Sequence, residues 1–98
     1  MSDRDDILKL LERNKEAIKG FGVRRLGIFG SLVREELGPE SDLDFIVEFD
    51  KKTFDTYMNL KFYLEDLFNR KVDLVLSDTI KPRLRPIIMK EAIYVPGL

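Results

Sequence analysis

Apolar side chains recur along the chain at spacings that predict helices and strands in turn. The first helix is indicated by four apolar residues near helical spacing: Ile7, Leu8, Leu11 and Ile18. Ser2 or Asp3 can cap its start, and Gly20 and Gly22 can close its end. We therefore expect one helix that leads up to Gly20.

Three further stretches are typical of strands. Residues 24–29 form a short apolar run that stops at the tight turn Gly30-Ser31, and a brief helix is expected next, over about residues 31–37. Residues 42–49 alternate polar and apolar side chains, which is the clearest strand pattern in the sequence. The apolar face of that strand comprises Leu43, Phe45, Val47 and Phe49. Residues 72–76 form the third predicted strand.

A helix is predicted over residues 53–69, where apolar residues recur every three or four positions. Its aromatic and methionine side chains, from Phe54 to Phe68, are expected to lie in the core. Pro82 and Pro86 bracket a further helix start, and Tyr94-Val95 can extend briefly. The order of elements predicts one domain over residues 1–98, of the α/β class with α+β as the borderline alternative, in which helices pack on a small sheet.

The composition narrows the chemistry that this domain can perform. The 98 residues are 44% hydrophobic and 36% charged, and 17 basic residues against 18 acidic ones leave a formal net charge of -1. No global field therefore indicates a nucleic-acid or membrane partner. Cysteine and histidine are absent. This excludes thiolate sites, Ser-His-Asp triads and ordinary zinc sites, and leaves carboxylates, hydroxyls, cations and hard metals such as magnesium.

The first residues show no targeting signal, and the apolar runs of the chain are too short for a membrane span. Residues 1–6 lack the apolar region of a signal peptide, and no apolar run approaches the ~20 residues of a membrane span. We therefore expect a cytoplasmic protein with no membrane partner. Two groups of basic residues are interpreted as solvated faces: Lys51 and Lys52, and the series Lys81, Arg83, Arg85 and Lys90.

The segment from Gly30 to Asp44 joins a strand-to-helix turn to a strand that opens with two carboxylates. Side chains on a strand repeat every second residue, so Asp42 and Asp44 should share a face, about 6 to 7 Å apart along the backbone. Magnesium binds hard oxygen ligands, usually one or two carboxylates together with substrate phosphates. Gly30 allows a triphosphate to approach the backbone, and the Ser31 hydroxyl and following amides can donate to phosphate oxygens.

A third carboxylate, Asp73, lies in the predicted strand 72–76, in a stretch that should be mostly buried. A two-metal site needs a ligand on the side of the attacking hydroxyl, and a carboxylate there can assist deprotonation of that hydroxyl. Taken singly, the glycine turn and the Asp-x-Asp pair are more often a helix start and solvated loop residues. Their order and spacing together favour a catalytic site.

This pattern resembles the minimal nucleotidyltransferase (MNT) branch of the DNA polymerase β nucleotidyltransferase superfamily. Its motif is Gly-Ser, a spacer and Asp-x-Asp, with a third Asp on a later strand, and the resemblance covers about residues 22–77. It implies the nucleotidyltransferase fold, with a mixed three- to four-stranded sheet. It also implies that Gly30 and Ser31 bind the phosphates of ATP or another nucleoside triphosphate, while two Mg²⁺ ions are held by three catalytic carboxylates: Asp42, Asp44 and Asp73.

Arg34 matches the arginine that family members usually have after the Gly-Ser pair, and it is a secondary candidate for phosphate contact. Val33 and Glu35 depart from the small residues common at their positions in the family. Both departures fall outside the expected metal ligands, so they leave the implied site intact.

The resemblance also implies a partner, because small MNT proteins are typically encoded with a HEPN-domain protein. The chain would then act as an antitoxin that adenylylates a HEPN toxin on a hydroxyl. Two alternatives remain open: a binding module that blocks a HEPN partner sterically with little catalysis, and transfer to a small molecule or an RNA end. Nucleic-acid binding, homo-oligomer formation and the choice of triphosphate also stay open.

Overall fold

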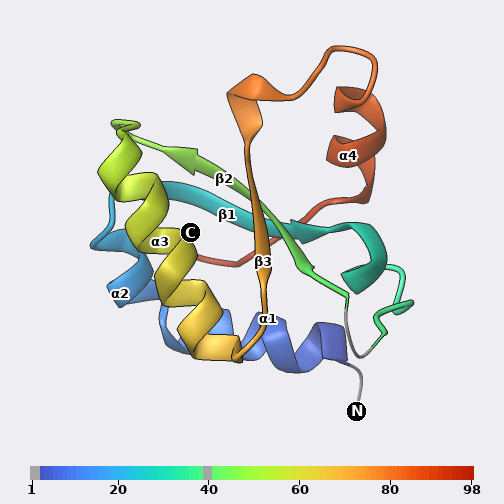
Figure 1. Ribbon diagram of the computed structural model, residues 1–98, viewed down its shortest axis with the longest axis horizontal. Coiled ribbons are helices and arrows are strands. Elements are labelled where there is room, and N and C mark those ends of the chain that lie inside the picture. Colours follow the sequence, from blue (N-terminus) through green and yellow to red (C-terminus); the bar gives the residue numbers. More distant parts are fainter. Residues whose placement is uncertain (1–2, 39–40) are drawn as a thin grey trace.

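A computed structural model describes residues 3–38 and 41–98, and its centre is one four-stranded sheet in the order β3-β2-β1-β4 (Figure 1). The strands are β1 (Val23–Phe29), β2 (Leu43–Phe49), β3 (Val72–Leu76) and β4 (Ile93–Tyr94). Strand β1 pairs antiparallel with both β2 and β4, whereas β2 and β3 run parallel. The expected small mixed sheet packed with helices is confirmed.

The N-terminal helix predicted as one element is two helices, α1 (Asp3–Arg13) and α2 (Lys15–Lys19). Asn14 separates them. Its side-chain amide donates to the Leu10 carbonyl at 2.8 Å, and its side-chain oxygen accepts from the Tyr63 hydroxyl at 3.0 Å. Side chains that bond to nearby backbone in this way favour breaks in a helix. The predicted end is confirmed, because Gly20 is the C-cap residue of α2, while Ser2 lies outside the described residues.

The brief helix expected over residues 31–37 is wrong. Only the 3-10 turn η1 (Gly30–Leu32) forms, and a turn follows it. Glu35 adopts a left-handed backbone with φ 58°. A non-glycine residue with positive φ cannot continue a right-handed helix, so the chain leaves the helical path within one turn.

The remaining helices are α3 (Phe54–Phe68) and α4 (Arg85–Glu91), with the 3-10 turn η2 (Ser77–Thr79) between them. Helix α3 starts with a reciprocal capping box between Thr53 and Thr56. Pro86 lies in the first turn of α4, as the sequence predicted. In α4, however, no residue is buried, and Ile87 is 63% exposed.

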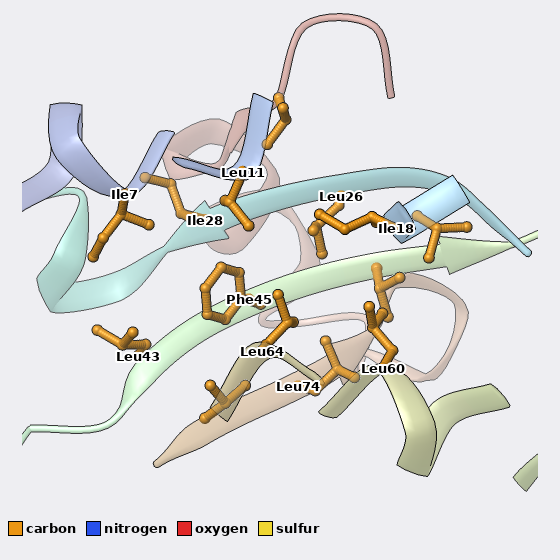
Figure 2. Packing of buried hydrophobic residues seen from close by; sticks show 14 of the residues in the cluster. Ile7, Leu11, Ile18, Leu26, Ile28, Leu43, Phe45, Leu60, Leu64 and Leu74 are labelled. Atoms are coloured by element: carbon orange, nitrogen blue, oxygen red, sulfur yellow. The ribbon is translucent and has the colours of Figure 1, made fainter. Parts of the chain in front are cut away.

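The core lies between one face of the sheet and the helices α1, α2 and α3 (Figure 2). The alternating residues Leu43, Phe45 and Val47 of β2 are fully buried there, as expected. The helices contribute five of the buried residues: Ile7, Leu11, Ile18, Leu60 and Leu64. The expectation that the aromatic and methionine side chains of α3 lie in the core is only partly confirmed, because Phe54 is 77% and Phe62 54% exposed. The other face of the sheet remains available for polar side chains.

The outer edge of β3 is closed by side chains of α3. The Tyr57 hydroxyl donates to the Leu74 carbonyl at 2.6 Å, and a Glu65 carboxylate oxygen accepts from the Val72 amide at 3.1 Å. These contacts satisfy backbone groups that an edge strand would otherwise expose. Within the described part of the chain, none of the helices has both the length and the apolar character needed to cross a membrane.

Candidate active site

The turn after β1 lies directly against Asp44 of β2. Phe29 pairs with Asp44 in the antiparallel ladder, and Gly30 follows with φ 71°. A Cβ atom at Gly30 would lie 2.2 Å from the Asp44 carboxylate, which is far inside van der Waals contact. Glycine is therefore needed here both for the left-handed backbone and for the space that the carboxylate occupies.

Asp44 and Asp73 are direct neighbours on the parallel strands β2 and β3. Paired residues on adjacent strands point to the same face, about 4.8 Å apart in the hydrogen-bonding direction. Asp42 lies one residue before β2 begins. The structure thus brings the three predicted carboxylates together near the starts of β2 and β3, on the face opposite the apolar core residues of β2.

The Asp44 carboxyl is the electrostatic centre of this group. Burial, followed by the negative charges of Asp73 and Asp42, raises its pKa from 3.8 to about 6. Arg34 acts in the opposite direction, and Glu91 adds a smaller repulsion. The expectation that Asp73 is buried is wrong, because its side chain is exposed and Asp44 is the more enclosed carboxylate. The reason is that β3 is an edge strand, with Asp73 on the open face.

The donor set fits a hard cation. The three groups are carboxylates, and their mutual repulsion at Asp44 is the kind that a divalent ion relieves. Over residues 3–38 and 41–98, no group of three or more such side chains is already arranged around a common metal position. The assignment of metals to Asp42, Asp44 and Asp73 stays a prediction.

Arg34 and the Gly30 amide both contact one carboxylate, that of Glu91 at the end of α4. The Gly30 N–H donates to Glu91 Oε1 at 2.5 Å, and Arg34 Nη1 donates to both Glu91 oxygens at 2.9 Å. Arg34 Nε also contacts Glu36 at 3.4 Å. The hydrogen bond and charge of Glu91 raise the Arg34 pKa above its ordinary value. Sequence patterns gave no signal for Glu91, because 57 residues separate it from Arg34.

Other backbone groups of the turn are used within the turn itself. The amides of Val33 and Arg34 donate to the Gly30 carbonyl, and the Ser31 carbonyl accepts from the Glu36 amide at 2.9 Å. Of the amides expected to donate to phosphate, only those of Gly30 and the residues next to it therefore remain candidates. The roles of Gly30, Ser31 and Arg34 in phosphate binding stay predictions.

Arg70 holds the segment that leads into Asp42. Its Nη2 atom donates to the carbonyls of Gly38 and Ser41, at 2.7 and 2.6 Å. The carbonyl of the next residue, Lys71, accepts a hydrogen bond from the Leu43 amide at 3.0 Å. The predicted loop 38–41 is fixed at both of these ends, while Pro39 and Glu40 lie outside the described residues. Arg70 was missed at the sequence level because carbonyl acceptors leave no pattern in the side chains.

An apolar hollow of about 520 Å³ lies beside the start of α3 and does not include the predicted site residues. It is lined in part by Phe54, Tyr57 and Leu76. The exposed ring of Phe54 borders this hollow instead of the core, which accounts for the difference from the expected helix face.

Comparisons with known proteins point to one family. The family model described as "Nucleotidyltransferase domain" matches residues 7–95. The chain is 37% identical over 87 residues to the protein adenylyltransferase MntA of Thermococcus cleftensis, covering 88% of both chains. It is also similar to a solved structure provisionally named as a minimal nucleotidyltransferase, with a TM-score of 0.73, 35% identity and 95% of each chain covered.

A second solved structure shares the fold at lower identity. It is a complex of a tri-AMPylated HEPN toxin from Shewanella oneidensis with its MNT antitoxin, and the similarity has a TM-score of 0.65 at 17% identity. The match covers 93% of this chain and 73% of that one. The family match, the similar structures and the Gly30 to Asp44 geometry lead to one conclusion: this chain belongs to the nucleotidyltransferase domain family and is a nucleotidyltransferase enzyme.

Proposed function

We propose that this chain transfers AMP from ATP to a hydroxyl group of a HEPN-type toxin and thereby acts as its antitoxin. The observation that supports this most directly is the Gly30 turn packed against Asp44, with Asp73 beside Asp44 on the next strand. A relative at 37% identity is named a protein adenylyltransferase. A similar fold occurs as the antitoxin of an AMPylated HEPN toxin.

Asp42, Asp44 and Asp73 would hold two Mg²⁺ ions in this reaction. Bound magnesium would neutralise charge on the triphosphate and lower the pKa of the attacking hydroxyl. The absence of histidine from the sequence is consistent with proton transfer to a carboxylate or to solvent.

The residues of the turn would position the nucleotide. The Gly30 amide and the Arg34 guanidinium are donors suited to phosphate oxygens, and Ser31 adds a hydroxyl beside them. Asp44 lies against Gly30, so a triphosphate held by the turn would also face the carboxylates. This arrangement would place the α-phosphorus between the turn and the acceptor.

Asp73 would face the acceptor. Its side chain is exposed on the edge strand β3, where a hydroxyl of another protein can approach it without a change in the core. One of its carboxylate oxygens would accept the hydroxyl proton as the new phosphate ester forms and pyrophosphate leaves. An open site of this kind suits a macromolecular acceptor that supplies the missing walls of the pocket.

The test is transfer of label from α-labelled ATP to a HEPN-type toxin, sought among the proteins encoded beside this chain, in the presence of magnesium. The matched control is the double variant Asp42→Asn, Asp44→Asn, which keeps side-chain size and removes both charges. We expect label on the HEPN protein with the natural chain only. Binding without label would support the steric module instead, and label on a small molecule or RNA end would replace the proposed acceptor.

A further inference from the structure

Glu91 contacts the phosphate-binding turn from a distant part of the chain. It is the last residue of α4, and its carboxylate accepts hydrogen bonds from the Gly30 amide at 2.5 Å and from Arg34 at 2.9 Å. A backbone amide beside an arginine is a donor arrangement that binds phosphate oxygens. In this structure the two donors converge on a carboxylate that belongs to the protein itself.

We propose that Glu91 occupies the place of a phosphate group in the nucleotide-free enzyme and that the triphosphate displaces it on binding. The proposal rests on the proposed assignment of Gly30 and Arg34 to the triphosphate. Glu91 then competes with the triphosphate for two donors. Its carboxylate holds the Gly30 amide and the Arg34 guanidinium until the nucleotide displaces it.

Two anions cannot share this position. The Gly30 amide has a single hydrogen, so a phosphate oxygen can bond it only after the Glu91 carboxylate has moved. Phosphate groups also have more negative charge than a carboxylate and form strong bonds to arginine. Replacement of the Glu91 carboxylate by phosphate is therefore favoured. Magnesium bound with the nucleotide favours it further, because the ion relieves the repulsion among the nearby carboxylates.

The surroundings of Glu91 allow this movement. No residue of α4 is buried, and the helix stands beside the sheet instead of covering the core (Figure 1). Ala92 is extended, with φ -61° and ψ 137°, and joins α4 directly to β4. The Glu91 side chain itself is 23% exposed. Its carboxylate can withdraw towards solvent while β4 keeps its pairing with β1 and the apolar core stays closed.

The experiment compares the affinity of the full chain for ATP with magnesium, and for inorganic tripolyphosphate, before and after the substitution Glu91→Gln. Isothermal titration calorimetry gives both affinities without an acceptor protein. Glutamine keeps the size of the side chain and removes the charge that competes with phosphate. We expect roughly three- to tenfold tighter binding of both ligands, in line with the loss of one partly exposed ion pair.

The matched control is Glu36→Gln. Glu36 is 64% exposed and contacts Arg34 at 3.4 Å through Nε, whereas the Gly30 amide donates to Glu91. We expect less than about a twofold change with this variant. Thermal unfolding of both variants checks that the fold is retained.

A merely structural role for Glu91 would move the affinity in the opposite direction. Unchanged or weaker binding by Glu91→Gln, with normal thermal unfolding, would overturn the proposal, as would equal tightening in the Glu36 control. The result is independent of label transfer to the HEPN protein. If Glu91→Gln binds ATP more tightly but no label reaches the HEPN protein, the HEPN protein is rejected as the acceptor and displacement of Glu91 by the triphosphate is retained. If label is transferred but binding is not tighter, only the displacement of Glu91 is rejected.

Discussion

Gly30 lies so close to Asp44 that a Cβ atom at Gly30 would be 2.2 Å from the Asp44 Oδ2 atom. Phe29, the residue before Gly30, also pairs with Asp44, so strand pairing couples the turn expected to bind phosphate to the strand expected to bind metal. This contact gives the two halves of the motif a fixed spacing, although 14 residues separate them in the sequence.

The substitution Gly30→Ala should damage activity more than stability. It places a methyl group on the Asp44 carboxylate and strains a backbone with φ 71°. We expect transfer to fall by about 10²-fold or more, because a displacement near 1 Å at a reacting centre has that effect. The free energy of unfolding should fall by about 1 kcal/mol or more from strain alone.

Gly22→Ala is the matched control for this change. Gly22 has φ 84°, but an added Cβ there would meet nothing within 4 Å. It should therefore lose a similar amount of stability and keep full activity. Comparable activity losses in the two variants would show that backbone strain, and not the contact with Asp44, is responsible.

The raised pKa of Asp44 predicts a specific pH dependence of stability when chelator removes divalent ions. Since its pKa is about 6 in the folded state against an ordinary 3.8, the folded chain retains a proton that the unfolded chain has released. The contribution of Asp44 to the free energy of unfolding is fully present below about pH 4 and is lost as the pH rises through about 6. Asp44→Asn should remove this loss and raise the melting temperature relative to the natural chain above pH 6.

Asp66→Asn serves as the control for that titration, because Asp66 is an exposed carboxylate on α3, away from the site. Its pH profile should follow that of the natural chain. If Asp44→Asn also followed the natural profile from pH 4 to 8, the repulsion at this carboxylate would be smaller than the geometry indicates.

Magnesium should stabilise the folded chain above pH 6, where Asp44 is charged. A ligand at about ten times its Kd that binds only the folded state adds ~1.4 kcal/mol to the free energy of unfolding. Thermal unfolding with and without Mg²⁺, at matched ionic strength, should show this gain in the natural chain. The Asp42→Asn, Asp44→Asn double variant should show little of it, and an equal gain in both proteins would place the ion elsewhere.

Arg70→Lys should lower transfer by several-fold while keeping the charge. Arg70 bonds the carbonyls of Gly38 and Ser41 with one nitrogen, and a lysine ammonium, on a shorter and more flexible side chain without the planar guanidinium, holds that geometry less firmly. The loss should appear in kcat at saturating ATP, since the loop before Asp42 is affected. Arg24→Lys, which alters the exposed pairs with Glu48 and Asp50, should leave kcat unchanged.

The sequence predicted the elements whose side chains follow a strict period. Strand β2 is the clearest example, because Leu43, Phe45 and Val47 alternate with polar residues and all three are fully buried. Helix α3 and the end of α2 at Gly20 were predicted for similar local reasons. The candidate carboxylates and the glycine turn followed from a motif, and the structure brings them to the same edge of the sheet.

What the sequence could not show are contacts made between distant backbone and side-chain groups. Asn14, which separates the first two helices, accepts a hydrogen bond from Tyr63, 49 residues away. Glu91 reaches Gly30 across 61 residues. Asp73 was expected to be buried because its neighbours are apolar, but the order of strands, which periodicity does not define, makes β3 an edge. Each difference arises from tertiary structure.

The closed edge of β3 limits how this protein can associate. Tyr57 and Glu65 take up hydrogen-bonding positions that an incoming strand would require, and β4 at the opposite side is two residues long. Addition of a foreign strand, the route by which many sheets grow into fibres, is therefore disfavoured at both margins. Partner proteins are therefore expected to bind through side chains on the surface. Evolution can change those side chains in both partners while the backbone of the fold stays the same.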